Sequence, residues 1–133
     1  MSDEDTLALS ELQLDVMRVL WARGEASVAD VAAALAARRD LAHTTVATVL
    51  SRLAKRGAVA ARREGRQLLY QATVSESGVR RSMVAGLIHS LFGGDPRALM
   101  AHLVQQREVG ADDLAEIKAL LAKQGGTTQA PKS

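Results

Sequence analysis

Hydroxyl and cationic side chains recur at helical spacing between residues 43 and 56. A threonine hydroxyl can donate a hydrogen bond to a nucleic-acid base or accept one from it, and its methyl group can contact the methyl group of thymine. Arginine and lysine neutralise phosphates and fix the register of a protein on a duplex. This combination predicts a surface that reads duplex DNA. The residues concerned are His43, Thr44, Thr45, Thr48, Arg52, Lys55 and Arg56.

These side chains require a helix that keeps them on one face. Such a helix is expected to start near residues 42–44 and to end before Gly57. Its apolar residues recur at i, i+3, i+4 and i+7, so one stripe packs inward and the polar side chains point outward. The N-terminal end of a helix in the major groove meets the base edges. The apolar stripe consists of Val46, Val49, Leu50 and Leu53.

Two further helices are expected before this one. Ser10 and Gln13 form an S-x-x-Q capping box that starts the first helix, and Gly24 ends it. The second helix begins at Ser27 and continues through its alanine-rich run to Ala37. Because the connection to the third helix is short, the second and third helices are predicted to form a helix-turn-helix.

Beyond the third helix the pattern changes from helical to alternating. Residues 59–64 and 67–73 each alternate between two faces, and Glu64-Gly65 offers a turn between them. This predicts a β-hairpin whose arginine-flanked tip would lie along the DNA backbone or the minor groove. Three helices followed by a hairpin are the order of a winged helix-turn-helix. The arginines are Arg62, Arg63 and Arg66.

Positive charge is concentrated in the same part of the chain. The formal net charge of all 133 residues is +2, made of −4 over residues 1–40, +5 over 41–75 and +1 over 76–133. A local excess of this kind is expected of a nucleic-acid contact surface. Each observation has another interpretation when it is taken alone. The run of charge would also fit a solvated face, and the threonines would also fit a capped, solvent-exposed helix start. The hairpin arginines would also fit an ordinary exposed strand.

The second half of the chain is expected to form apolar helices that need a partner. A helix over about 79–92 is followed by a Gly-Gly-Asp-Pro break and by two shorter helices. A three-helix unit of this size seldom buries enough apolar surface to stand alone. We therefore expect it to pair with the same segment of a second chain, the alternative being that it folds back on its own DNA-binding domain. The expected dimer interface consists of Val79, Met83, Leu87, Ile88, Leu91, Phe92, Leu99, Leu103, Leu114, Ile117 and Leu121.

The predicted fold is mainly α with a small β-hairpin. An N-terminal winged helix-turn-helix over residues 1–75 precedes a C-terminal helical dimerisation region over 76–124, and residues 125–133, which lack a periodic apolar pattern, are expected to be a disordered tail. No apolar run approaches the ~20 residues that cross a bilayer, and no secretory signal is visible, so a cytoplasmic protein is predicted.

The sequence contains few residues that would indicate a catalytic or metal-binding site. The chain has no cysteine, which excludes disulfides and thiolate metal sites. No phosphate-binding loop or nucleophile motif is present, so neither an enzyme nor a cofactor is predicted. The three histidines lack the i, i+4 spacing of a helical metal pair, and no metal site is predicted. The alternative is a metal held by His102 with acidic residues across a dimer.

Seven short motifs stand at fixed places relative to the predicted helices and hairpin. They are Leu9-Ser10-Glu11-Leu12-Gln13, Val19-Leu20-Trp21, Ser27-Val28-Ala29-Asp30-Val31, the run from Thr44 to Leu53, Lys55-Arg56-Gly57, Glu64-Gly65-Arg66 and Leu91-Phe92-Gly93-Gly94. Together they resemble the penicillinase-repressor (BlaI/MecI) family of transcriptional repressors, over roughly residues 7–124.

The resemblance implies a homodimer that binds a double-stranded DNA operator of dyad symmetry and blocks transcription. It also implies release by cleavage in the dimerisation helices, triggered by a membrane-embedded sensor metalloprotease or by a protease that the sensor activates. In the best-known members the scissile bond is Asn-Phe, and the bond aligned with it here is His102-Leu103. A copper-responsive branch carries C-terminal cysteine motifs, which this chain lacks.

A rival hypothesis from another class is a winged-helix adaptor that binds proteins and never touches DNA. The arginine-rich hairpin and the +5 segment argue against it, because an adaptor has no need of them.

Overall fold

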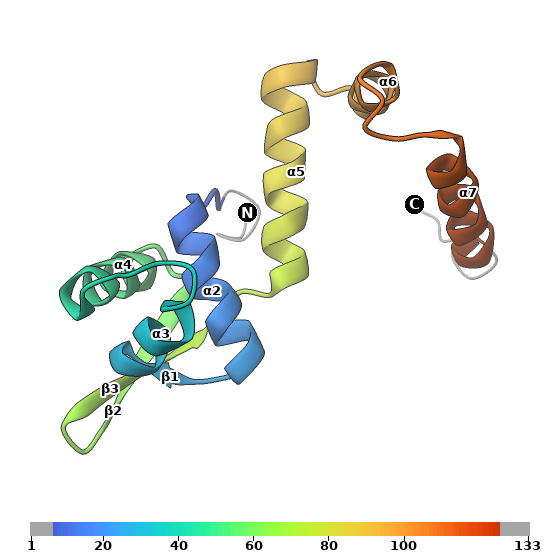
Figure 1. The fold of residues 1–133 in the computed structure, drawn as a ribbon. Helices are drawn as coiled ribbons and strands as arrows, with labels where there is room; N and C mark the ends of the chain where they lie inside the picture. Colours follow the sequence, from blue (N-terminus) through green and yellow to red (C-terminus); the bar gives the residue numbers. More distant parts are fainter. Residues whose placement is uncertain (1–6, 126–133) are drawn as a thin grey trace. The chain divides into compact units, whose positions relative to one another are not determined.

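The computed structural model describes residues 7–125 and divides into two compact units between Leu87 and Ile88. Its helices and its small antiparallel sheet confirm the predicted fold class. The elements, drawn in Figure 1, are α2 (Glu11–Arg23), β1 (Ala26–Ser27), α3 (Val28–Leu35), α4 (His43–Lys55), β2 (Val59–Glu64), β3 (Gln67–Ala72), α5 (Glu76–Phe92), α6 (Pro96–Gln105) and α7 (Ala111–Gly125).

One apolar core holds the first unit together. The predicted stripe of α4 is buried along its whole length, and it packs with the inner faces of α2 and α3. Tyr70 joins the same core from the sheet and is 6% exposed. Burial of such side chains is the main favourable term in folding. The largest fully buried side chains are Val16, Met17, Leu20, Val31, Val46, Leu50, Leu53 and Val79.

Side-chain caps fix the starts of the first two helices where the sequence predicted them. The amide of Gln13 donates to Oγ of Ser10 at 3.1 Å, and the amide of Ser10 donates to Oε1 of Gln13 at 3.0 Å, which completes the capping box of α2. Ser27 and Asp30 form the equivalent pair at the start of α3. Gly24, with φ of 90°, ends α2.

The second helix is shorter than predicted. It ends at Leu35 rather than at Ala37, although alanine favours helix. The amides of Arg38 and Arg39 both donate to the carbonyl of Leu35, at 2.9 and 2.7 Å, so the chain already turns here. The side chains of both arginines bind a carboxylate on α2, a tertiary contact that outweighs local propensity.

The sheet has a third strand that the sequence did not reveal. β1 pairs antiparallel with β3, with Ala26 opposite Tyr70 and Ser27 opposite Leu69, and the strand order is β1-β3-β2. Two residues are too few to show an alternating pattern, so only the pairing identifies this strand.

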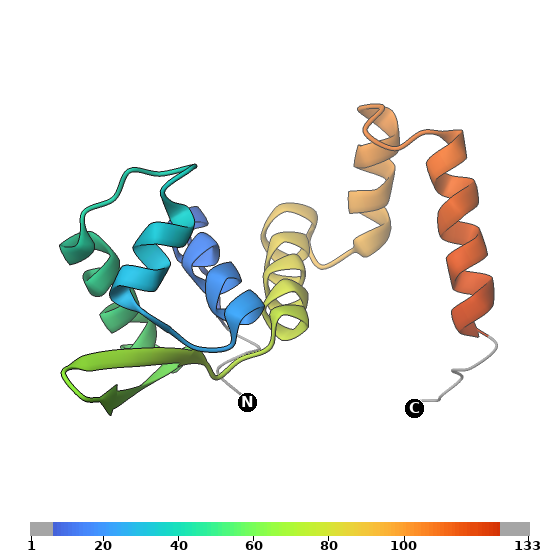
Figure 2. The same cartoon turned by 60° about the horizontal axis from the view of Figure 1, so that its bottom comes forward.

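The predicted hairpin is present over β2 and β3. Its register runs from Val59 opposite Ala72 to Glu64 opposite Gln67, which leaves Gly65 and Arg66 as a two-residue loop. Gly65 has φ of 63°, and glycine at the first loop position is typical of a type II′ turn. The tip of the hairpin stands clear of the helices (Figures 1 and 2).

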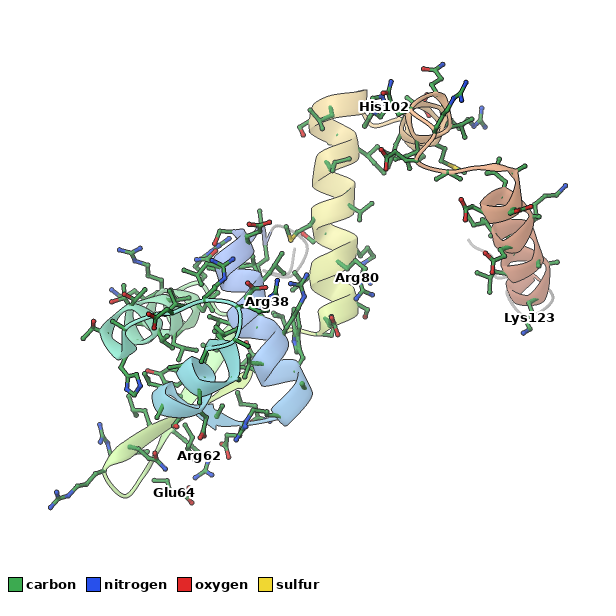
Figure 3. The ribbon with its side chains drawn as sticks, in the orientation of Figure 1. Arg38, Arg62, Glu64, Arg80, His102 and Lys123 are labelled. Atoms are coloured by element: carbon green, nitrogen blue, oxygen red, sulfur yellow. The ribbon has the colours of Figure 1, made fainter. Side chains whose placement is uncertain are left out.

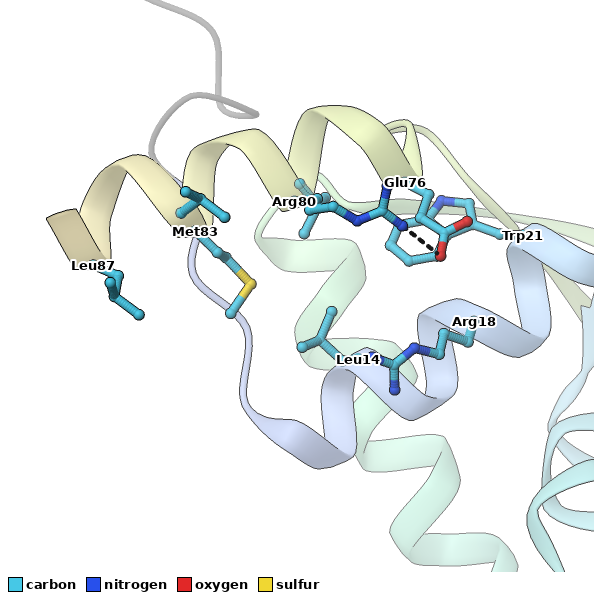
Figure 4. Close-up of a pocket in the computed structure, with 9 residues that line it drawn as sticks. Leu14, Arg18, Trp21, Glu76, Arg80, Met83 and Leu87 are labelled. Carbon is cyan, nitrogen blue, oxygen red and sulfur yellow. Dashed lines mark ion pairs between the residues drawn. The ribbon is translucent and has the colours of Figure 1, made fainter. Parts of the chain in front are cut away.

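The first turns of α5 belong to the core of the first unit. Val79 is 1% exposed, and Met83 packs against the buried cluster. Nε1 of Trp21 on α2 donates to the carbonyl of Val74 at 2.9 Å, which fixes the chain just before α5. Between α2 and α5 a pocket of about 250 Å³ remains, with Arg18 and Arg80 beside it (Figure 4).

The second unit consists of the last turn of α5 with α6 and α7. Gly93 and Gly94 end α5 at φ of 58° and 86°, and Oδ1 of Asp95 accepts from the amide of Arg97 at 2.9 Å to cap α6. None of the described side chains from residue 88 to residue 123 is buried. The tail was predicted to start at residue 125, but Gly125 is the last residue of α7. The rest of the predicted tail, residues 126–133, lies outside the described residues, and the predicted domain boundaries remain predictions.

Among residues 7–125, no helix combines the length and the apolar character that crossing a membrane requires.

Candidate nucleic-acid interface

The N-terminal half of α4 presents its polar residues outward. His43, Thr44, Thr45 and Thr48 are all exposed, as the sequence predicted, because the opposite face of α4 is buried in the core. Ala42 is the N-cap residue, with extended backbone and no side-chain acceptor. The first turn of α4 therefore meets its surroundings with uncapped N–H groups and short hydroxyl side chains.

One of the three threonines has its hydroxyl proton engaged. Oγ1 of Thr48 donates to the backbone carbonyl of Thr44 at 2.9 Å, a bond within the helix. In this conformation Thr48 offers its methyl group and its oxygen lone pairs to a ligand.

A hollow of about 420 Å³ separates α4 from the hairpin. His43 borders it from α4, and Arg63 and Arg66 border it from the hairpin. None of the residues that line it is acidic, so the hollow suits an anionic group such as a phosphate. The lining residues are Ser27, Val28, Ala29, His43, Ala47, Arg63, Arg66, Gln67, Leu68 and Tyr70.

Arg62 differs from the other two hairpin arginines because an acidic residue holds it. Its Nε lies 2.6 Å from Oε2 of Glu25, and its Nη2 donates to Oε1 at 2.8 Å. Figure 3 labels Arg62 on the hairpin. The hydrogen bond from Arg62 lowers the pKa of Glu25, and the same bond raises the pKa of Arg62. A neutralised guanidinium attracts a phosphate less than a free one, so Arg63 and Arg66 are the stronger candidates for DNA contact.

The cationic residues near the end of α4 are exposed. In the described part of the chain, Arg52 and Lys55 form no ion pair, which leaves both charges available to phosphates. Nη1 of Arg56 donates to Oε1 of Gln13 at 3.4 Å and links the end of α4 to the cap of α2.

The sequence did not reveal two features of this surface, and both depend on β1. Glu25 directly precedes Ala26, so the pairing of β1 with β3 carries its carboxylate to the hairpin. The same pairing carries Ser27 and Val28 to the edge of the hollow. Glu25 could be predicted to pair with a hairpin arginine only if the pairing of β1 with β3 were already known.

No three His, Asp or Glu side chains within residues 7–125 lie close enough together to hold a metal ion.

Three helices, an exposed polar N-terminus on the third, and a basic antiparallel hairpin define the winged helix-turn-helix class of DNA-binding domains. The chain belongs to the penicillinase repressor family, whose model matches residues 9–123. The family is one of DNA-binding transcriptional repressors and not of enzymes, which confirms the resemblance and the class predicted from the sequence.

Similar proteins agree with this assignment. The transcriptional regulator BlaI of Mycobacterium tuberculosis (strain ATCC 25618 / H37Rv) is 39% identical over 117 residues, which cover 86% of this chain and 83% of BlaI. The methicillin resistance regulatory protein MecI of Mammaliicoccus sciuri is 23% identical, over 91% of this chain and 98% of MecI.

Solved structures share the fold. The solution structure of the DNA binding domain of the repressor BlaI matches with a TM-score of 0.50 and 30% identity, over 55% of this chain and 89% of that one. The YusO protein from Bacillus subtilis matches with a TM-score of 0.55 and 16% identity, over 90% of this chain and 77% of YusO. At this level of identity the match shows a shared fold and nothing further.

Proposed function

We propose that this chain represses transcription as a homodimer on an inverted-repeat DNA operator. The observation that carries the proposal is the acid-free hollow between α4 and the hairpin, bordered by His43, Arg63 and Arg66. The exposed threonines lie at the end of α4 that would enter the major groove. A duplex offers both kinds of partner, since base edges meet the threonines and phosphates meet the arginines.

The proposal gives the exposed side chains of this surface two roles. Thr44, Thr45 and Thr48 read bases, with His43 beside them at the helix start. Phosphates are bound by Arg52, Lys55, Arg56, Arg63 and Arg66, and Arg62 joins them when its pair with Glu25 opens.

The second unit supports the homodimer. It buries no described side chain, and several of its large apolar residues are exposed, including Leu91 at 69% and Leu121 at 60%. Such a surface requires a partner to be stable, and a second copy supplies one of the right kind. A two-fold axis would place two α4 helices about one helical turn of DNA apart, or a multiple of that distance.

Release by proteolysis at His102-Leu103 completes the proposal. Both residues lie within α6, where His102 is exposed and its ring lies 5.8 Å from that of Phe92. A protease would need α6 to open locally before it could cut this bond. A membrane sensor metalloprotease, or a protease that it activates, is the proposed partner, and the cytoplasm is the proposed location.

An electrophoretic mobility shift on DNA upstream of the chain's own gene tests the central step. We expect Arg52→Ala and Arg66→Ala to weaken binding to every duplex, and Arg97→Ala, on α6, to leave it unchanged. Changes at Thr44, Thr45 or Thr48 should alter the ranking of operator variants. Equal losses on all sequences would contradict their base-reading role. No shift by the wild-type protein, with no nucleic acid co-purifying, would favour the protein adaptor instead.

A further inference from the structure

Asp15 is the one charged side chain that is buried among the described residues, and it binds three arginines. It is 3% exposed and lies on α2. Its Oδ1 accepts from Nη1 of Arg18 at 3.0 Å and from Nη1 of Arg38 at 3.4 Å, and its Oδ2 accepts from Nε of Arg39 at 2.8 Å. One carboxylate thus holds three guanidinium groups of like charge close together.

This cluster joins α2 to the segment that leads into α4. Arg38 and Arg39 stand in the turn after α3, and α4 starts soon afterwards at His43 (Figure 3 labels Arg38). The start of α4 has no side-chain cap of its own, because Ala42 is the N-cap residue. The path of the connection therefore contributes directly to where the first turn of α4 lies.

We infer that Asp15 is a positioning residue for DNA recognition, because it fixes the α3–α4 connection and with it the N-terminal end of α4. The inference rests on the proposed function, in which that end reads bases. Without the carboxylate, three neighbouring guanidinium groups repel one another and the connection moves away from α2. Recognition needs side chains held within about 0.5 Å of their working positions, so a small displacement weakens base contacts more than phosphate contacts.

The rest of α4 is held independently of Asp15. Val46, Leu50 and Leu53 are fully buried in the core. We therefore expect the helix to stay docked when Asp15 is replaced, while its first turn loses its fixed position.

The test compares affinity for the operator with affinity for a scrambled duplex of equal length, at one salt concentration, using the full chain. Asp15→Asn should lower the ratio of the two affinities by about tenfold, comparable with one mismatched base pair. Arg39→Ala should lower the same ratio, although it changes the net charge in the opposite direction. A general charge effect would change DNA binding in opposite directions in the two variants, whereas loss of positioning lowers the ratio in both. Glu76→Gln is the control, because it removes an exposed carboxylate that pairs with Arg80 at 3.4 Å on α5.

Thermal unfolding establishes that each variant is folded at the assay temperature. A folded Asp15→Asn protein with the wild-type ratio would overturn the inference, as would an equal loss on both duplexes. If Asp15→Asn does not fold, the ratio measured for Arg39→Ala tests the inference instead. Arg39 is 31% exposed, so its replacement disturbs the core less than replacement of the buried Asp15. A wild-type protein without preference for the operator would contradict the proposed function itself, which distinguishes the two failures.

Discussion

At the residue scale, the ion pairs decide which cations of the basic surface are free. From the sequence alone, Arg62, Arg63 and Arg66 appear equivalent, because a charge pattern does not show which arginine forms an ion pair. The structure separates them, since Glu25 holds Arg62 while Arg63 and Arg66 border the hollow. Glu25 therefore restrains DNA affinity in the proposed function.

Replacing this carboxylate tests the restraint. Glu25→Gln should leave Arg62 with only its longer ion pair to Glu64, at 3.8 Å, and so make it more available to a phosphate. The plot of log affinity against log salt should then become steeper by up to about 0.9 per protomer. The control is Glu76→Gln, which makes the same charge change on α5. An unchanged slope for Glu25→Gln, with the control also unchanged, would show that Arg62 does not reach the DNA.

Asp15 gives the stability of the protein a predictable dependence on pH. The hydrogen bond from Arg39, with the charges of Arg38, Arg39 and Arg18, holds the pKa of Asp15 below its ordinary value of 3.8. Because the folded state binds the proton less readily than the unfolded chain, this contribution is complete above about pH 4 and is lost as the pH falls through the folded pKa. The melting temperature of the wild type should fall more steeply with acid than that of Asp15→Asn. Parallel curves would contradict this account.

At the scale of the elements, features that depend on neighbouring residues could be predicted from the sequence, whereas features that depend on tertiary contacts could not. The capping boxes at Ser10 and Ser27 mark helix starts, because the bonds that make them lie within four residues. The end of α3 depends on the contact of Arg38 and Arg39 with a distant carboxylate. β1 exists only through its pairing with β3. The same division applies to the site, where the exposed face of α4 was predictable and Glu25 was not.

The hairpin turn offers a clean test at this scale. Gly65 has φ of 63°, and a Cβ built there meets no atom within 4 Å, so a substitution would cost backbone energy alone. Gly65→Val should destabilise the hairpin by about 1–2 kcal/mol, whereas Gly65→Asn should cost less, because asparagine adopts positive φ more readily. Hydrogen exchange of the β2 and β3 amides measures both. Equal protection in the wild type and Gly65→Val would contradict the turn geometry.

At the scale of the whole molecule, the proposed homodimer depends on apolar side chains that the single chain leaves exposed. Val79, one of the predicted interface residues, is instead buried in the core of the first unit. Leu87, on the same helix, is 41% exposed. An amphipathic pattern shows that a face is buried but not against which partner, and so the sequence could not separate these two positions.

Leu87→Asp tests whether α5 forms the interface. The charge would have to be buried without a partner in a dimer, so sedimentation should show monomers at concentrations where the wild type is dimeric. Ser77→Asp, an exposed position in the first turn of α5, is the control and should leave the dimer intact. A dimeric Leu87→Asp protein would move the interface elsewhere.

The most direct test of the whole account is the salt dependence of operator binding by the wild-type protein. Three to five phosphate contacts per protomer predict that the affinity of the dimer falls by roughly 10³- to 10⁵-fold between 50 and 200 mM salt. An affinity that does not change across this range would contradict the assignment of α4 and the hairpin as a surface that binds duplex DNA.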